Sequence, residues 1–193
     1  MVKAAPSKWN VANAVTIARI VLVPIFALTL LAGGGGSVAW RLVATAIFVF
    51  AASTDKVDGY LARRLDLVTE LGALLDPIAD KLLVGTALVI LSALGDLPWW
   101  VTVVILVREL GITALRFALL RQGATLPVSR GGKWKTVMQS IAISMYLLPL
   151  SVLPTWASVI AAVVMGVAVL ITVVTGIDYV REAVRMRHAA PAR

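Results

Sequence analysis

The chain has 193 residues, of which 60% are hydrophobic, and its mean hydropathy is +0.94. An ordinary soluble domain is nearer ~45–50% apolar, so the composition excludes that class and indicates a polytopic membrane protein. The formal net charge of +8 comes without any nucleic-acid recognition motif, which favours basic residues on the cytoplasmic side of a membrane over nucleic-acid binding.

Apolar stretches of about 20 residues recur along the chain and predict one all-α membrane domain over residues 1–193. A short interfacial segment, Met1 to Asn10, precedes the first of them. The six expected transmembrane helices are Val11 to Ala32, Val38 to Arg63, Thr69 to Leu94, Pro98 to Arg121, Trp134 to Leu150 and Thr155 to about Val180.

Basic residues are distributed unevenly between the connections of these spans. No Lys or Arg occurs in three of the connections, Gly33 to Ser37, Gly95 to Leu97 and Ser151 to Pro154. Of the 18 basic residues, only Arg41 falls clearly in the half of the membrane where these three connections lie. Because the basic side is cytoplasmic, we expect a multi-pass protein of the inner or plasma membrane with both termini inside.

Four carboxylates interrupt the second and third spans. Asp55 and Asp58 are three residues apart, and Asp76 and Asp80 are four apart, so each pair lies on one face of its helix. A turn around Leu65 to Val68 would bring the two pairs to one depth. Four converging carboxylates repel one another unless a cation neutralises them, and their oxygens suit Mg²⁺, Mn²⁺ or Ca²⁺. We therefore expect a divalent metal site that also takes a phosphorylated ligand and opens to the cytoplasm.

Two neighbouring residues fit a phosphorylated ligand. Gly59 leaves room for close approach, and Arg63, one turn later, can pair with a phosphate in bidentate fashion. The alternative is that the acids only form helix-packing salt bridges. Charges paired inside a membrane are usually functional, which favours the site. The bases available for such bridges are Lys56, Arg63, Arg64 and Lys81.

The order Asp-x2-Asp-Gly-x2-Ala-Arg-x8-Gly-x3-Asp-x3-Asp resembles the signature of the CDP-alcohol phosphotransferases. Every fixed position is filled, by Asp55, Asp58, Gly59, Ala62, Arg63, Gly72, Asp76 and Asp80. The resemblance implies a homodimeric enzyme that transfers a phosphatidyl group to an alcohol and releases CMP. It also implies two Mg²⁺ or Mn²⁺ ions on the four aspartates, with Asp80 as the base for the attacking hydroxyl. The glycines, Ala62 and Arg63 would hold the cytidine nucleotide.

A second group of basic residues follows the aspartates. Arg108 and Arg116 lie inside the fourth span at i and i+8, roughly on one face, and so imply a cavity. Cations at the membrane surface, such as Arg121, Arg185 and Arg187, are explained as well by contact with membrane lipid phosphates.

Three further stretches are similar to the members of the family that use sn-glycerol 3-phosphate as acceptor. They are Asn13 with Thr16 and Arg19, Gly132 to Thr136, and Gly176 to Tyr179. This similarity implies CDP-diacylglycerol as donor, with Asn13, Thr16 and Arg19 on the donor side. The residues expected to hold the acceptor phosphate are Arg116, Lys133, Lys135 and Arg181.

Other functions remain open at this point. The same chemistry is possible with inositol phosphate as acceptor, or with phosphatidylglycerol as in cardiolipin synthesis. A cation transporter that uses the acids as an ion path is less favoured, because the two-half symmetry common in transporters is not visible in the sequence.

Overall fold

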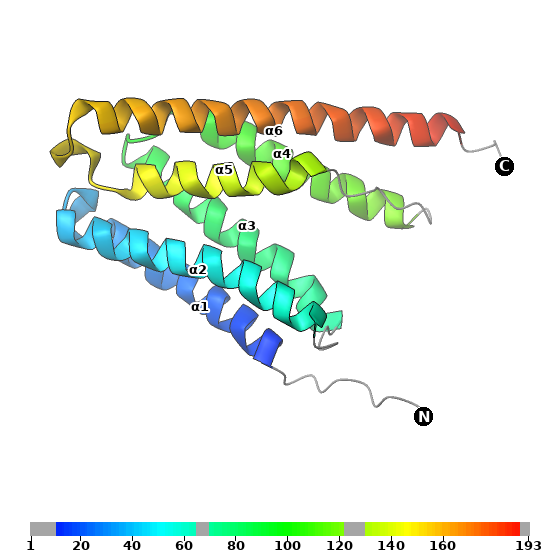
Figure 1. Cartoon of the computed structure of the whole chain (residues 1–193), viewed down its shortest axis with the longest axis horizontal. Coiled ribbons are helices and arrows are strands. Elements are labelled where there is room, and N and C mark those ends of the chain that lie inside the picture. The colour runs from blue at the N-terminus through cyan, green and yellow to red at the C-terminus, as the bar shows by residue number, and fades with distance from the viewer. Residues whose placement is uncertain (1–10, 65–69, 122–129, 190–193) are drawn as a thin grey trace.

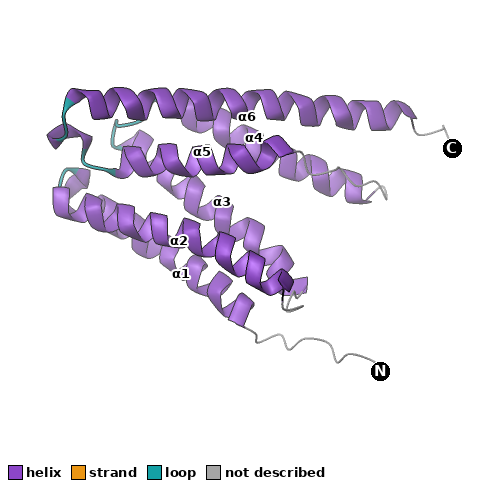
Figure 2. Cartoon of the chain, viewed as in Figure 1, coloured by secondary structure: helices purple, strands orange, loops and turns teal. Residues whose placement is uncertain are grey.

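The computed structural model describes the backbone of residues 11–64, 70–121 and 130–189, and the side chains of residues 15–54, 77–119 and 134–186. This described part contains six α-helices, two short 3-10 turns and no strand (Figures 1 and 2). The α-helices are α1 Val11–Leu31, α2 Val38–Arg64, α3 Glu70–Ala93, α4 Trp99–Arg121, α5 Arg130–Leu147 and α6 Thr155–Ala189. The predicted all-α class is therefore confirmed.

Two helices extend beyond the predicted spans. α5 begins at Arg130 rather than Trp134, and α6 continues to Ala189 rather than ending near Val180. Both extensions are polar, so the hydropathy pattern that defined the spans stops before the helical backbone does. The α6 extension also consists mainly of good helix formers such as Arg, Glu, Ala and Met.

Two segments of the described residues are long and apolar enough to cross a membrane, Val15–Gly35 and Thr155–Met186. The apolar part of α2 is shorter, Val38–Thr54. α3, α4 and α5 carry charged residues such as Lys81, Arg108 and Lys135 within their length. The insertion of these four helices into a membrane therefore stays a prediction.

The helices pack in two groups that share contacts. α1 packs along α2 and α3, while α6 packs along α5 and α4. Contacts of α5 with α2 and α3, and of α3 with α4, join the groups into one bundle. In Figure 1 the turns between α1 and α2 and between α5 and α6 lie at the left, and α1 and α2 diverge from α5 and α6 toward the right.

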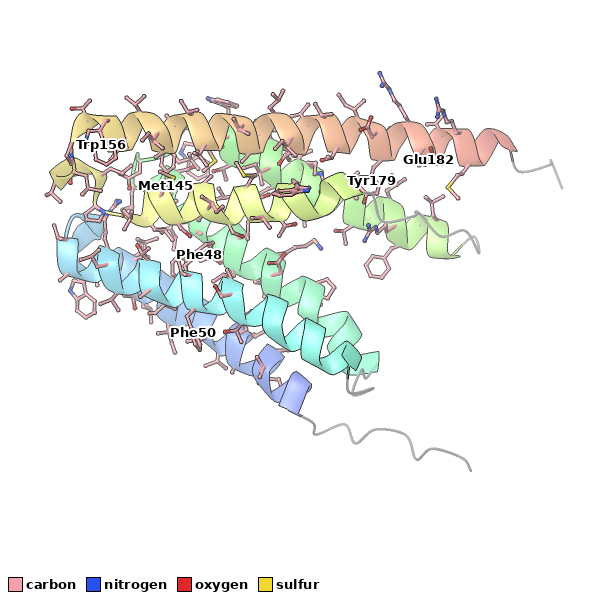
Figure 3. All side chains as sticks on the ribbon, viewed as in Figure 1. Phe48, Phe50, Met145, Trp156, Tyr179 and Glu182 are labelled. Carbon is pink, nitrogen blue, oxygen red and sulfur yellow. The ribbon has the colours of Figure 1, made fainter. Side chains whose placement is uncertain are left out.

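Large apolar side chains fill the interior of the bundle. Phe26 of α1 and Phe48 of α2 are fully buried, with ring centroids 5.8 Å apart. Phe50 follows two residues after Phe48, points away from the bundle and is 63% exposed (Figure 3). On α3, Leu83, Ala87 and Leu91 recur every four residues and form one buried face.

The turn between α1 and α2 is fixed by glycine. Gly33, Gly34 and Gly35 have φ of 66°, 68° and 74°, values that side-chain-bearing residues rarely adopt. A Cβ on Gly35 would lie 2.6 Å from both methyl carbons of Leu94, at the end of α3. The glycine run is therefore a tight turn packed on its neighbour rather than only a flexible connection.

Arg41 joins three turns at this end of the bundle. Its side chain is buried, forms an ion pair with Asp96 and donates from Nε to the Gly35 carbonyl at 2.5 Å. Nη1 donates to the Tyr146 and Leu148 carbonyls, both at 3.4 Å. The base that the sequence singled out only by its position thus links the α1–α2 and α3–α4 turns with the end of α5.

Candidate active site

A pocket with charged side chains in its lining lies between α3, α4 and α5. Its lining includes one carboxylate each from α3 and α4, one lysine each from α3 and α5, and amide and hydroxyl groups from α5. The lining residues are Asp80, Lys81, Val84, Leu106, Glu109, Leu110, Lys135, Thr136, Gln139 and Ser140. The α5 members recur at a spacing of four residues and so share one face of that helix. Two acids and two bases thereby surround one pocket in a largely apolar bundle.

Glu109 is the central anion on the α4 side of this pocket. Its Oε1 forms an ion pair with Lys135 Nζ and accepts a hydrogen bond from Arg108 Nη1 at 3.2 Å. The Lys135 side chain is only 4% exposed and that of Glu109 19%. One carboxylate therefore holds two cations, from α4 and α5, at the wall of the pocket.

Arg108 and Arg116 both contact Tyr179 of α6. Their guanidinium carbons lie 5.7 and 5.6 Å from the centroid of the Tyr179 ring, within cation–π range. Arg116 Nη2 also donates to Tyr179 Oη at 3.3 Å. Figure 3 shows Tyr179 on the part of α6 that runs over α4 and α5. The two arginines share one face of α4, as their spacing predicted, and Tyr179 is buried against it.

Two more residues of α6 determine the position of the Arg108 side chain. Thr175 Oγ1 accepts a hydrogen bond from Arg108 Nη2 at 3.1 Å. At Gly176 a Cβ would lie 3.1 Å from Arg108 Cγ, so a larger residue would push the arginine side chain aside. The Gly176 to Tyr179 stretch therefore positions α4 cations, a role that the spacing within α6 alone does not reveal.

The four residues expected at the acceptor phosphate are placed differently. Lys135 lines the pocket, and Arg116 lies in the cation cluster on Tyr179. Arg181 is exposed, and it follows Tyr179 by two residues, about 200° around the helix and so away from the cluster. Lys133 lies on α5, but its side chain is outside the described residues.

The expected metal ligands lie on α2 and α3, which contact each other. Asp80 is half-buried and lines the pocket, and its carboxylate is the hard oxygen donor that Mg²⁺ or Mn²⁺ requires. Asp55, Asp58 and Asp76 lie within helical backbone, but their side chains are outside the described residues. Among the described side chains no three of His, Cys, Asp or Glu form a group that could hold a metal ion. The donor set fits the expected metal by its chemistry, and the site remains a prediction.

The expected donor-side residues are only partly described. Thr16 and Arg19 are both 3% exposed on α1, which packs along α2 and α3. A nearly fully buried arginine requires polar surroundings, so its position beside the aspartate-bearing helices fits a polar cavity. The side chains of Asn13, Gly59, Ala62, Arg63 and Gly72 lie outside the described part of the chain.

Glu109 and Gln139 line the pocket although the sequence did not identify them as site residues. Glu109 had one available signal, since it is an acid between two arginines of the fourth span. Gln139 had only its spacing of four residues from Lys135, which is common to any residue of one helical face.

The chain matches the family model described as CDP-alcohol phosphatidyltransferase over residues 9–174. A relative from Mycobacterium tuberculosis, strain H37Rv, is described as a probable phosphatidylglycerophosphate synthase. It is 55% identical over 176 residues, which cover 91% of this chain and 82% of the relative. A relative from Bacillus subtilis, described as CDP-diacylglycerol–glycerol-3-phosphate 3-phosphatidyltransferase, is 40% identical over 180 residues, 89% of this chain and 93% of the relative. A relative from Rickettsia bellii with the same description is 35% identical over 173 residues, 88% of this chain and 93% of the relative.

Proposed function

Since this chain belongs to the CDP-alcohol phosphatidyltransferase family, we propose that it transfers the phosphatidyl group from CDP-diacylglycerol to sn-glycerol 3-phosphate. The products are phosphatidylglycerophosphate and CMP. The observation that carries this proposal is the identity of 55% and 40%, over about nine-tenths of the chain, with relatives whose descriptions name this activity or its product.

The pocket residues have suitable chemistry for the acceptor half of the reaction. Lys135 in the pocket lining and Arg116 over the Tyr179 ring offer positive charge for the phosphate of glycerol 3-phosphate. Asp80 takes the proton of the acceptor's primary hydroxyl. The oxygen of that hydroxyl attacks the phosphorus that carries the diacylglycerol. The new P–O bond joins phosphatidyl and acceptor, and the broken pyrophosphate P–O bond releases CMP. Lys133 and Arg181 are further candidates for contact with the acceptor.

The four aspartates are proposed to hold the divalent metal. Asp55, Asp58, Asp76 and Asp80 provide oxygen ligands from α2 and α3, enough to share two Mg²⁺ or Mn²⁺ ions. When bound, these ions neutralise the negative charge of the pyrophosphate and of the departing CMP.

The donor nucleotide is proposed to lie on the α1–α2–α3 side of the bundle. Its contacts would come from Gly59, Ala62 and Arg63 of α2, with Gly72 allowing close approach from α3. Thr16 and Arg19 support this placement because they are buried polar side chains of α1, which packs along both helices. Asn13 lies about one turn before Thr16 on α1.

We also propose that all six helices cross the membrane with the aspartate motif at the cytoplasmic side. Large apolar side chains cover the outside of the bundle, including Leu28, Val107 and Leu170 at 72%, 66% and 62% exposure. A water-soluble surface rarely carries so much exposed apolar area. A homodimer is proposed on the family resemblance.

An acceptor panel tests the proposed activity. Purified protein with CDP-diacylglycerol and Mg²⁺ should release CMP when given sn-glycerol 3-phosphate, and far less when given inositol phosphate or phosphatidylglycerol. CMP release that depends on one of the other two acceptors would replace the acceptor assignment. If none of the three acceptors led to CMP release, the transferase activity itself would be refuted.

A further inference from the structure

Gln139 carries an unused hydrogen-bond acceptor in the pocket wall. The residue is 4% exposed, and its Oε1 is buried without a hydrogen-bond partner in the described part of the chain. Other polar groups of the same wall are paired, since Ser140 donates to the Thr136 carbonyl at 2.9 Å and Lys135 is paired with Glu109. A buried polar atom without a partner is costly, so its retention in a pocket points to a ligand that supplies a donor.

The position of Gln139 relates it to the two groups already assigned to the acceptor. It follows Lys135 by four residues on the same face of α5, a rise of about 6 Å along the helix. Asp80 lines the same pocket from α3. The pocket thus offers a cation for a phosphate, a carboxylate for the reacting hydroxyl and an amide oxygen for one further donor.

We propose that Gln139 accepts a hydrogen bond from the secondary hydroxyl of the acceptor and thereby selects its enantiomer. This inference rests on the proposed function, in which Lys135 holds the phosphate and Asp80 faces the primary hydroxyl. Two contacts alone do not distinguish sn-glycerol 3-phosphate from its mirror image, sn-glycerol 1-phosphate. When the phosphate and the primary hydroxyl of the two enantiomers are held in the same places, the hydroxyl and the hydrogen on the central carbon exchange positions. The secondary hydroxyl of the mirror image then points away from Gln139. The third contact therefore makes the pocket chiral.

The test compares three acceptors with the wild-type protein and with Gln139→Leu. The acceptors are sn-glycerol 3-phosphate, sn-glycerol 1-phosphate and 3-hydroxypropyl phosphate, which lacks only the secondary hydroxyl. For the wild type, kcat/KM should be about 10- to 100-fold higher for sn-glycerol 3-phosphate than for either analogue, the range expected when one buried acceptor is left without a donor. In Gln139→Leu the three values should come within a few-fold of one another.

Thr172→Val provides a matched control. Thr172 of α6 is fully buried, and its Oγ1 also has no partner within the described residues, but it does not line the pocket. Its substitution also removes a buried oxygen without a partner among the described residues and should leave the discrimination between the three acceptors as in the wild type.

The outcomes separate this inference from the proposed function. CMP release with sn-glycerol 3-phosphate but equal wild-type values for all three acceptors would refute the role of Gln139 without any variant. Discrimination that persists unchanged in folded Gln139→Leu would refute it as well. No CMP release with sn-glycerol 3-phosphate in the wild type would instead refute the proposed acceptor, and the inference with it.

Discussion

Replacement of Glu109 by glutamine is the most direct test of the charge arrangement in the pocket. Glu109→Gln keeps the size of the side chain and removes the negative charge that faces two cations. Lys135, nearly fully buried, would lose its ion-pair partner, and Arg108 would lose a charged acceptor while keeping its hydrogen bond to Thr175. The protein would then hold buried Lys135 and half-buried Arg108 without the carboxylate that both contact.

The expected cost follows from this geometry. Breaking a buried ion pair at one partner costs about 3–5 kcal/mol, and the 19% exposure of Glu109 places it at the lower end, about 3 kcal/mol. For a chain of this length that free energy corresponds to a fall of roughly 6–12 °C in the midpoint of thermal unfolding. The measurement is the unfolding midpoint of protein purified in detergent.

The reverse truncation should cost much less. In Lys135→Met the carboxylate of Glu109 still accepts from Arg108, so no buried charge is left alone. We expect this variant to lose about 1 kcal/mol and the double variant Glu109→Gln with Lys135→Met to recover most of the stability lost by Glu109→Gln. Strictly additive losses in the double variant, or an unchanged midpoint in Glu109→Gln, would show that the pair is not coupled in the folded protein.

Four other predictions test the remaining parts of the site and fold. Chelation of divalent cations should abolish CMP release and added Mg²⁺ or Mn²⁺ should restore it, whereas activity that survives chelation would contradict the aspartate metal site. Arg116→Ala should raise the KM for glycerol 3-phosphate by about 10- to 150-fold and that for CDP-diacylglycerol much less, with exposed Arg185→Ala as the unaffected control. Arg41→Ala should lower the unfolding midpoint by several degrees at unchanged KM values, because its contacts lie in turns away from the pocket, and a selective loss of acceptor binding would argue against a purely structural role. A cysteine at Gly36, where a Cβ meets nothing within 4 Å, should react with an impermeant maleimide outside intact cells and a cysteine at Arg185 should not, and the opposite labelling would reverse the proposed orientation.

The fold was largely predictable because hydropathy and helix length are local properties. Each of the six expected spans corresponds to an observed α-helix, and the main errors are the starts and ends at Arg130 and Ala189. Those errors arise because a helix continues past its apolar part wherever its backbone hydrogen bonds can form. Hydropathy measures only the apolar part.

The pocket was predictable only in part because it depends on the rotation of each helix. The spacing of Arg108 and Arg116 predicted a common face correctly, and both contact Tyr179. Nothing in the spacing of α4 or α5 states that Glu109 meets Lys135, because that contact is set by the packing of α4 and α5 around α3. Contacts within a helix follow from its period, whereas contacts between helices require the tertiary structure.

Arg41, Arg108 and Arg116 differ in how much of their hydrogen-bonding capacity is used within the described residues. All three guanidinium nitrogens of Arg41 have partners, which are three backbone carbonyls and Asp96. Arg108 and Arg116, by contrast, each keep a buried Nε without a hydrogen-bond partner in the described part of the chain. A fully paired cation has little capacity for a ligand and so stabilises turns, whereas partly paired cations beside a pocket carry desolvated charge that a phosphate can complete. Arg41 is the most buried of the three and Arg108 and Arg116 are only half-buried, so burial alone would point to the wrong arginine. We therefore expect the number of unmet donors to be the better guide to where an anionic substrate binds.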